Sequence, residues 1–362
     1  MNIEKIAENF GIKSQNLTCN ECTTGHINST FFIKPDDGSS DEYVFQKVNT
    51  SIFKKPDELM SNVFKVTEHI KKKIHEEHDV ISQTLDFIKT VNGDYGYVDD
   101  EGEYWRAYRF VNNAHSLNAA NSTELLESSG YAFGNFQRQL SDFDASELYE
   151  TIPNFHNTVS RLNDLKTAIA SDLAGRKKDI SDDISFVLDR EDKCSYIVDG
   201  ISAGKFPLRV THNDTKLNNL LWDDVTEKCV CVIDLDTVMP GSVLYDFGDA
   251  IRFGASSAAE DETDLSKVYM CLDKFEAYVR GFISGTRGAL TENELLAFPM
   301  GAYIITLEIG IRFLTDYLNG DTYFRIHYPT QNLDRAKNQF KLVKSMEEQM
   351  DEMNRIMQKY VK

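Results

Sequence analysis

The sequence contains few basic residues and no long cluster of them. Among its 362 residues there are 39 Lys and Arg against 58 Asp and Glu, a formal net charge of -19, and the longest basic run is Lys71–Lys73. Because binding to a phosphate backbone needs clustered Lys and Arg, we expect no nucleic-acid partner. The excess of negative charge favours solubility and does not indicate a fold.

Cysteine is also scarce. The six cysteines are too few for a disulfide framework in a chain of this length. Cys19 and Cys22 have the C-x-x-C spacing of a zinc site, but no second Cys or His pair follows at zinc-finger spacing, so we expect no zinc. Cys229 and Cys231 alternate in a strand-like run and are expected in the core.

The sequence lacks both a secretory signal and an uninterrupted membrane-spanning run. Its first ten residues, MNIEKIAENF, include acidic residues where a signal peptide would be basic. The most apolar stretch, FPMGAYIITLEIGIRFL, contains Glu308 and Arg312, which favours a buried helix over a membrane span. We therefore expect a cytoplasmic protein that has no membrane partner and is long enough for two domains.

Hydrophobic periodicity predicts an antiparallel sheet followed by a mainly helical region. Alternating apolar residues and short turns predict strands at STFFIKP and YVFQKVN, one strand before them, and a hairpin that includes YWRAYRFV. Apolar residues three and four apart predict a helix over Pro56–Asp79. From residue 112 the pattern is helical, apart from a β-rich interval at Leu208–Ile233. The predicted fold class is α+β, with an N-terminal sheet domain at 1–111 and a helical C-terminal domain at 112–362.

The last predicted helix, Leu333–Tyr360, carries methionines at helical spacing. A stripe of this kind usually packs on a core, and a contact in a dimer is the alternative. We expect a monomer or a weak homodimer.

One short polar segment, VTHNDTKLNN at 210–219, contains the residue types that phosphoryl transfer requires. This reaction depends on positioning and on neutralising charge, so a carboxylate base, a cation and oxygen ligands for Mg²⁺ suffice. The H-x-D-x-x-x-x-N spacing matches a kinase catalytic loop, which makes Asp214 the candidate base, Lys216 the catalytic cation and Asn219 a Mg²⁺ ligand. His212 is expected to hold the loop by hydrogen bonds, and a role as base is the alternative.

A second carboxylate is expected at the end of a strand that follows this loop. The segment NLLWDDVTEKCVCVIDLD predicts a hairpin ending at Asp234, the candidate second Mg²⁺ ligand. Asp236 is a candidate substrate group, and support of the metal site without direct contact to the ion is the alternative. Asp246 begins a literal D-F-G, but it follows a turn and opens a predicted helix. We therefore predict that Asp246 accepts backbone N–H groups and braces the loop at Asp214.

Neither G-x-G-x-x-G nor a Walker sequence is present, so the nucleotide-binding residues rest on weaker signals. The loop at 25–30 joins two predicted strands and offers backbone N–H groups and hydroxyls to phosphates, with an ordinary hairpin as the alternative. Lys47, in the third predicted strand, could reach the α- and β-phosphates and pair with Glu68. The candidate nucleotide-binding residues of this region are Gly25, Asn28, Ser29, Thr30 and Lys47.

Taken together, THNDTKLNNLLWD and VIDLDTVMPGSVLYDFGDAIRF resemble the aminoglycoside phosphotransferase and choline kinase superfamily, and RFLTDYLNGDTYF resembles its N-acetylhexosamine 1-kinase branch. The resemblance covers nearly the whole chain. It implies a bilobal protein-kinase-like fold, ATP and Mg²⁺ as cofactors, and phosphorylation of the anomeric hydroxyl of GlcNAc or GalNAc. It also assigns Lys47 to the phosphates, where most relatives have Arg.

The resemblance further implies contacts to both substrates. Arg312 and Tyr323 are expected to touch the sugar, and the backbone around Val111, within Phe110–Asn112, is expected to bind the adenine edge. The sequence alone does not decide which group pairs with Arg312. A charge in an apolar helix needs a partner, which is either the substrate or Glu308 one turn earlier.

Two other functions stay open from the sequence. One is a kinase for another small alcohol: choline, ethanolamine, an aminoglycoside or an unacetylated sugar. The other is a nucleotide-binding scaffold without activity. Such a scaffold is expected to lack at least one of Asp214, Asn219 and Asp234, and all three are present.

Overall fold

The chain forms two compact units. The first comprises Met1–Ser116, Asp142–Pro153 and Leu220–Pro240, and the second comprises Leu117–Ser141, Asn154–Asn219 and Gly241–Lys362. The predicted division after residue 111 stays a prediction, because compactness alone does not show which segments fold independently. The computed structural model describes residues 1–13, 16–22, 27–36, 38, 41–77, 83–120 and 122–361.

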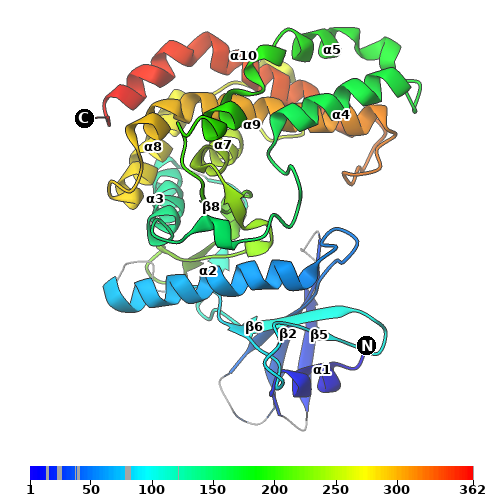
Figure 1. Cartoon of the computed structure of the whole chain (residues 1–362), viewed down its shortest axis with the longest axis vertical. Coiled ribbons are helices and arrows are strands. Elements are labelled where there is room, and N and C mark those ends of the chain that lie inside the picture. The colour runs from blue at the N-terminus through cyan, green and yellow to red at the C-terminus, as the bar shows by residue number, and fades with distance from the viewer. Residues whose placement is uncertain are drawn as a thin grey trace. The chain divides into compact units, whose positions relative to one another are not determined.

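The first unit contains an antiparallel sheet with the strand order β1-β2-β3-β6-β4, and β5 pairs with β6 (Figure 1). The three predicted N-terminal strands and the predicted hairpin are confirmed, whereas the short strand β4 was not predicted. The strands are β1 (Leu17–Cys22), β2 (Ser29–Pro35), β3 (Tyr43–Lys47), β4 (Phe87–Ile88), β5 (Tyr97–Val98) and β6 (Tyr104–Arg109).

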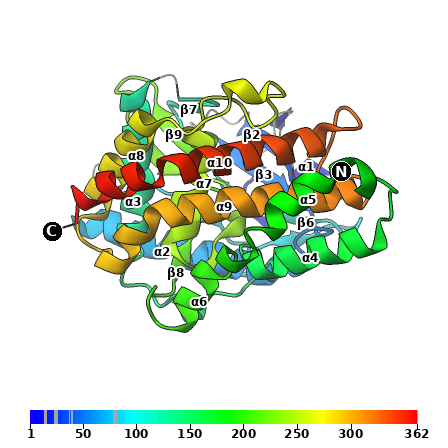
Figure 2. The same ribbon diagram turned by 90° about the horizontal axis from the view of Figure 1, so that it is seen from above.

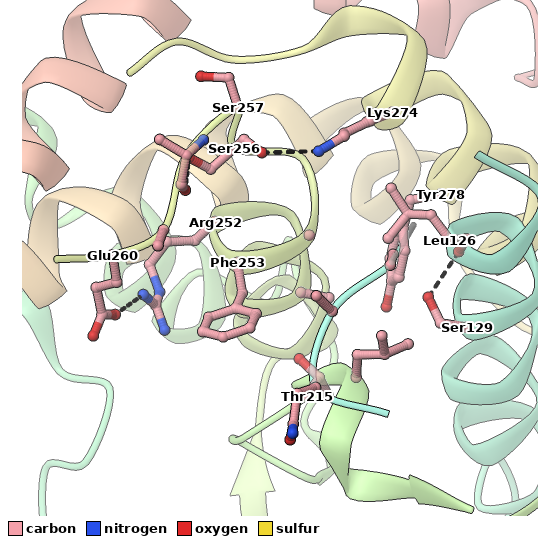
Figure 3. A pocket seen from close by; sticks show the side chains of 18 of the residues that line it. Leu126, Ser129, Thr215, Arg252, Phe253, Ser256, Ser257, Glu260, Lys274 and Tyr278 are labelled. Atoms are coloured by element: carbon pink, nitrogen blue, oxygen red, sulfur yellow. Dashed lines mark hydrogen bonds and ion pairs between the residues drawn. The ribbon is translucent and has the colours of Figure 1, made fainter. Parts of the chain in front are cut away.

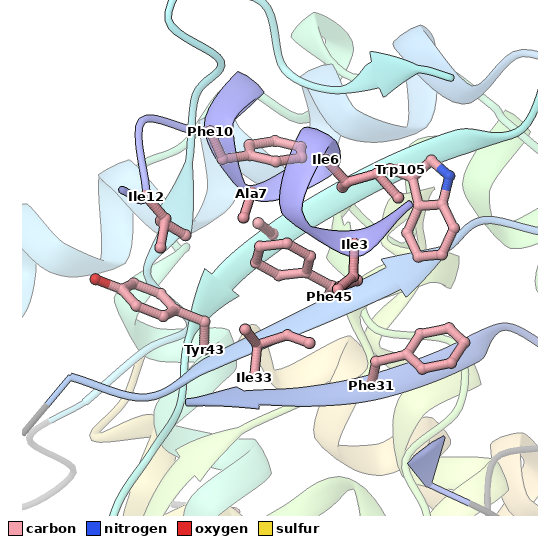
Figure 4. Packing of buried hydrophobic residues seen from close by; sticks show 11 residues of the cluster. Ile3, Ile6, Ala7, Phe10, Ile12, Phe31, Ile33, Tyr43, Phe45 and Trp105 are labelled. Atoms are coloured by element: carbon pink, nitrogen blue, oxygen red, sulfur yellow. The ribbon is translucent and has the colours of Figure 1, made fainter. Parts of the chain in front are cut away.

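One face of this sheet packs against helix α1 (Ile3–Asn9), which was not predicted (Figure 4). Alternate residues of a strand point to the same face, so the residues in this core identify the buried face of each strand. The sheet contributes Phe31, Ile33, Tyr43, Phe45, Trp105 and Ala107 to the core.

Helix α2 (Pro56–Glu77) is the predicted helix of the first unit. It begins with Pro56, whose missing N–H costs no helical hydrogen bond there, and Asp57 and Glu58 favour the positive end of the helix dipole. The predicted apolar stripe is buried at Leu59, Val63, Val66 and Ile70.

A second, three-stranded sheet in the first unit has the order β10-β9-β7. Its strands are β7 (Ala114–Ser116), β9 (Leu220–Asp223) and β10 (Cys229–Val232). The antiparallel pair β9 and β10 is the hairpin predicted around DDVTEK. Cys229 and Cys231 are buried, as expected.

The second unit is mainly helical, which confirms the predicted α+β class (Figures 1 and 2). Two long helices, α9 and α10, lie side by side in both views. The helices are α3 (Thr123–Gln139), α4 (Thr158–Ser171), α5 (Ser181–Leu188), α6 (Tyr196–Ser202), α7 (Val243–Gly254), α8 (Leu272–Thr286), α9 (Glu292–Leu318) and α10 (Gln331–Gln358). The short strand β8 (Arg209–Thr211) belongs to this unit, and β11 (Met239–Gly241) lies where the chain enters it.

Helix α9 is the predicted buried helix. It begins with a capping box, in which Thr291 Oγ1 accepts from the Glu294 N–H and the Glu294 carboxylate accepts from the Thr291 N–H. By length and composition alone it could cross a membrane, and 83% of its most apolar 18-residue window is buried inside the structure.

Helix α10 carries the predicted methionine stripe. Met346, Met353 and Met357 are buried, and Met350 is partly exposed. The stripe therefore packs within the second unit, which confirms the core interpretation.

Helices α3 and α8 approach each other closely because glycines face the contact. A Cβ atom on Gly281 would lie 1.9 Å from the carbonyl oxygen of Glu127, and one on Gly134 would lie 2.2 Å from that of Phe282. These atoms are backbone, so they cannot move aside as a flexible side chain can. The close contact between the two helices therefore requires glycine at positions 134 and 281.

We expect Gly281→Ala to lower the free energy of unfolding by about 1–3 kcal/mol, because the added methyl overpacks the helix contact. In an exposed helix, replacing Gly by Ala stabilises the protein by about 1 kcal/mol. The sign of the change in unfolding free energy therefore shows whether the added methyl group is overpacked. Urea unfolding measures the change. Ser284→Ala, at an exposed position of the same helix, is the control and should have little effect. A stabilised Gly281→Ala variant would show that the helices are not in close contact.

Candidate active site

Three residues predicted from the polar segment lie together in the second unit. The segment runs from β8 into a 3-10 turn at Leu217–Asn219. The Asp214 carboxylate accepts from Asn219 Nδ2 at 3.0 Å through Oδ2, and its Oδ1 lies 2.7 Å from Lys216 Nζ. The Asp214 side chain keeps 27% of its surface exposed. This carboxylate is thus fixed by two donors and still accessible, as a general base must be.

The Lys216 side chain remains positively charged beside Asp214. Burial would lower the pKa of Lys216, but the charges of Asp214 and Asp249 outweigh burial and raise it. The side chain is one-third exposed. Its ammonium group is therefore charged at neutral pH and can neutralise a second anion besides Asp214.

Asn219 is held by its side-chain amide nitrogen. This nitrogen donates to both the backbone oxygen of Asp214, at 2.8 Å, and the Asp214 carboxylate. The two bonds fix the carboxamide beside Asp214. The role of Asn219 as a Mg²⁺ ligand stays a prediction.

Asp246, in the first turn of α7, braces the loop as predicted. Its Oδ2 accepts from the His212 N–H at 3.0 Å and from Gln137 Nε2 at 2.7 Å, and its Oδ1 accepts from the Asn213 N–H at 2.7 Å. Burial raises the pKa of the Asp246 carboxyl, even though these donors oppose the shift. Asn213 has a φ of 65°, which Asn tolerates better than most residues. The predicted structural role of Asp246 is confirmed.

A second carboxylate on α7, Asp249, also holds the loop. Its Oδ2 accepts from the Thr215 N–H at 3.0 Å, and its Oδ1 accepts from the Arg252 guanidinium at 2.8 Å. Arg252 also pairs with Glu260, and both line a cavity of about 420 Å³ that Thr215 borders (Figure 3). Burial would raise the pKa of Asp249, but Arg252 and Lys216 outweigh burial and lower it. The charges of Asp249, Arg252 and Glu260 therefore each already have a partner of opposite sign.

His212 has the structural role that we predicted. Its side chain is wholly buried, and its Nδ1 accepts from the Asp214 N–H at 3.3 Å. Phe133 and Phe136 of α3 meet the imidazole ring edge-on. A buried ring that bonds the loop backbone is not placed to take a proton from a substrate.

A buried histidine and glutamate support the loop from the other side of its backbone. His156 Nε2 lies 3.2 Å from the backbone oxygen of Asn213, and its Nδ1 lies 2.8 Å from Glu308 Oε1. Thr158 donates to Glu308 Oε2 at 2.7 Å. Burial would raise the pKa of Glu308, but His156 outweighs burial and lowers it. Glu308 is thus bound by His156 and Thr158, so the ion pair with Arg312 that was one alternative is not seen.

The two residues predicted to touch the sugar line one cavity of about 620 Å³. The Arg312 guanidinium lies 3.4 Å from the Tyr323 hydroxyl and stacks near the Phe155 and Phe324 rings. Arg161 faces the same cavity. Burial and, after it, the charge of Arg312 lower the pKa of Arg161. The cavity therefore presents two guanidinium groups, the carboxylates of Asp164 and Asp316, and several hydroxyl or amide groups.

In the first unit, Asp234 follows β10 and precedes a 3-10 turn at Leu235–Thr237. Its φ is 58°, a left-handed conformation that Asp and Asn adopt more readily than other side chains. The strand end thus turns sharply at the candidate Mg²⁺ ligand. Its role as a ligand stays a prediction.

Of the candidate phosphate-contacting residues, Lys47 lies on the sheet face that packs against α1, and Thr30 lies on the opposite face. Lys47 shares the face of Phe45, which packs against α1, and pairs with Glu103 at 3.2 Å. Glu68 pairs with Lys71 instead, so the guess that Lys47 pairs with Glu68 is wrong. The role of Lys47 at the phosphates stays a prediction.

The remaining nucleotide-binding predictions fall at strand ends. Ser29 begins β2 opposite Lys47, and Thr30, on the other face, accepts from Gln46 Nε2 at 3.0 Å. Val111 follows the end of β6. Gly25 lies outside the described residues. These assignments stay predictions.

Asp236, predicted as a substrate group, has both carboxylate oxygens occupied within the first unit. Oδ1 pairs with Arg106 at 2.5 Å, and Oδ2 accepts from Asn28 Nδ2 at 2.6 Å. Sequence reasoning missed Arg106, although an arginine at an inward position of a strand could have signalled a buried partner. It also missed Gln137, Asp249 and His156. Of these last three residues, only Asp249 had a sequence signal, because it follows Asp246 on the same helical face.

A sheet unit together with a mainly helical unit that holds an H-x-D-x-x-x-x-N loop is typical of kinase-like phosphotransferases. The chain belongs to the phosphotransferase enzyme family, whose model matches residues 18–268.

Solved structures share the fold over the whole chain, which confirms the predicted kinase-like class. A microcompartment-associated aminopropanol kinase has a TM-score of 0.59 and 13% identity, covering 97% of this chain and 98% of that one. A choline kinase from Cryptosporidium parvum has a TM-score of 0.58 and 14% identity, with 99% and 98% covered. A spectinomycin phosphotransferase in complex with ADP and spectinomycin has a TM-score of 0.56 and 12% identity, with 95% of each chain covered.

We expect Asp246→Asn to lower the free energy of unfolding by about 1.5–3 kcal/mol, since the amide replaces a charged acceptor and turns an N–H toward one of the loop donors. Urea unfolding measures the change. Asp223→Asn is the matched control, because Asp223 also accepts backbone N–H groups in a turn but is partly exposed, and it should have a much smaller effect. Equal losses in the two variants would contradict the bracing role.

Proposed function

We propose that this protein is an ATP-dependent kinase that transfers the γ-phosphate of ATP to the anomeric hydroxyl of an N-acetylhexosamine, GlcNAc or GalNAc. The product is the hexosamine 1-phosphate. The observation that carries the proposal is the Asp214 carboxylate, which is oriented by Lys216 and Asn219 on a loop that Asp246 braces. This arrangement belongs to a chain of the phosphotransferase enzyme family.

In the proposed reaction, Asp214 accepts the proton of the sugar hydroxyl as the hydroxyl oxygen attacks the γ-phosphorus. The bond between the γ-phosphorus and the bridging oxygen of ADP breaks, and ADP leaves. Lys216 neutralises charge on the phosphate oxygens, because its ammonium remains protonated beside Asp214. The loop is held before substrate binds, so no reorganisation of these groups is needed in the transition state.

The proposed Mg²⁺ ligands are Asn219 and Asp234. An amide oxygen and a carboxylate are the hard oxygen donors that Mg²⁺ prefers, and the Asn219 nitrogen is already committed to Asp214. When bound, the ion would supply neutralisation of the phosphate charge. Nucleotide use is supported by the spectinomycin phosphotransferase of similar fold, which was solved with ADP.

The cavity at Arg312 favours a neutral sugar over a cationic alcohol. Arg161 and Arg312 both face it, and their mutual repulsion opposes a further positive charge. Of the two carboxylates in its lining, Asp164 pairs with Arg161 at 3.6 Å. The carboxylate of Asp316 is no counter-ion for a ligand, because it accepts the N–H groups of Tyr323 and Phe324. Guanidinium groups bind hydroxyl and acetamido oxygens well. These features support an N-acetylated sugar more than choline or ethanolamine.

The second candidate is a kinase for another small alcohol, and the similar folds of an aminopropanol kinase and a choline kinase favour it. A panel that measures ADP release with Mg²⁺ separates the two. It contains GlcNAc, GalNAc, glucosamine, choline, ethanolamine and an aminoglycoside. We expect turnover with the acetylated sugars. Turnover with the amines alone would favour the second candidate, and no ADP from any member would favour an inactive scaffold.

We expect Asp214→Asn to lower kcat by about 10²–10⁴-fold while the fold stays intact, because the variant lacks the base but keeps the shape of the side chain. Steady-state kinetics with the best acceptor measures the effect. Asp224→Asn is the control, since Asp224 is an exposed carboxylate that pairs with His115. Near-normal turnover in Asp214→Asn would refute the role of Asp214.

We expect Arg312→Gln to raise the acceptor KM about 10–100-fold and to leave the KM for ATP unchanged, because the variant loses a charged donor to the sugar. Arg280→Gln, which removes an exposed arginine paired with Glu127, is the control. An increase in the KM for ATP alone would place Arg312 at the nucleotide instead.

A further inference from the structure

The main sheet of the first unit has two chemically different faces. On the face that packs against α1, the strands contribute the aromatic core, and Lys47 follows Phe45 on that face. On the opposite face, Thr30, Gln46 and Arg106 are linked by hydrogen bonds. Lys47 is paired with Glu103 on the α1 face, whereas Arg106 is a buried cation on the opposite face.

Arg106 is held in one geometry by three groups. Its Nε donates to Gln46 Oε1 at 2.9 Å, its Nη1 pairs with Asp236 Oδ1, and its guanidinium lies 5.6 Å from the centre of the Phe87 ring. The side chains of Arg106 and Asp236 are only 3% and 6% exposed. A buried pair of this kind is costly unless each charge is well satisfied, and here each has further partners.

Asp236 joins this cation to the loop before β2. Its second oxygen accepts from Asn28 Nδ2 at 2.6 Å, and Asn28 Oδ1 accepts from the Asn49 N–H at 2.9 Å. The Asn28 carboxamide therefore makes two bonds inside the protein.

The same pair acts on Asp234, two residues before Asp236. Burial would lower the pKa of Arg106, but Asp236 and, more weakly, Asp234 outweigh burial and raise it. Asp234 adopts its left-handed conformation directly before the turn that Asp236 occupies. A side chain fixed at Asp236 therefore fixes the direction in which the chain leaves Asp234.

We propose that Arg106 and Asp236 form a positioning pair, which holds the metal ligand Asp234 and the residue Asn28, directly before β2, in register for the Mg²⁺ nucleotide. Asp236 has no contact with the acceptor. The inference rests on the proposed function, because it assigns Asp234 and Asn28 to Mg²⁺ and ATP. Partners that orient a metal ligand typically change metal affinity by about 10–100-fold when they are removed.

The test is calorimetric binding of the non-hydrolysable analogue AMP-PNP, at a series of MgCl₂ concentrations, to the full-length protein. The variants are Arg106→Gln, Asp236→Asn and Asn28→Ala, with Lys34→Gln as the control because Lys34 forms an exposed ion pair with Glu42. Urea unfolding of each variant identifies the folded ones. Asn28 is partly exposed, whereas Arg106 is buried, so Asn28→Ala is expected to fold even if Arg106→Gln does not.

We expect each folded variant except the control to bind Mg²⁺·AMP-PNP about 10–100-fold more weakly. In Asn28→Ala/Asp236→Asn the loss should be smaller than the product of the single losses, because both residues act through one bond. The KM for the acceptor should stay unchanged in Asp236→Asn.

Unchanged AMP-PNP affinity in the folded variants overturns the proposal, and so does a loss confined to the acceptor KM, which would make Asp236 a substrate group. Failure of the unaltered protein to bind Mg²⁺·AMP-PNP contradicts the proposed function itself and removes the basis of the pair. Normal binding by the unaltered protein with normal binding by the variants leaves the proposed function standing and rejects only the pair.

Discussion

The arrangement of the loop at 210–219 depends on one buried carboxylate, that of Asp246. It accepts the N–H groups of two consecutive loop residues, His212 and Asn213, directly before Asp214. These donors would otherwise be buried without a partner, which is costly. A charged acceptor at the start of α7 also lies at the positive end of the helix dipole. The bond thus stabilises the helix and orders the loop at once.

Each unit holds its polar groups by the same means, a buried charge with several partners. In the second unit Asp246 and Glu308 support the loop from different helices. In the first unit Arg106 and Asp236 join a central strand to the turn after Asp234. Phosphoryl transfer requires pre-organisation of this kind, because the reaction needs positioned charges more than covalent chemistry.

The sequence was most informative where an interaction is local in the chain. The alternation of apolar residues predicted β2 and β3. The spacing of the polar segment singled out Asp214, Lys216 and Asn219, which contact one another in the structure. The role of Asp246 followed from its place at a helix start. Partners distant in sequence, such as His156 beneath Asn213 or Arg106 beside Asp236, left no comparable signal, because only the tertiary fold brings them together. The fold class was therefore predictable, and the groups that support the site were not.

The central claim is transfer of phosphate to the anomeric oxygen, and phosphorus NMR of the reaction product tests it most directly. The protein is incubated with ATP, Mg²⁺ and N-acetylglucosamine, and the product phosphorus is correlated with the sugar protons. We expect a phosphate monoester coupled to the anomeric proton, in an amount equal to the ADP formed. A phosphate coupled to another position of the sugar, or release of inorganic phosphate alone, would contradict it.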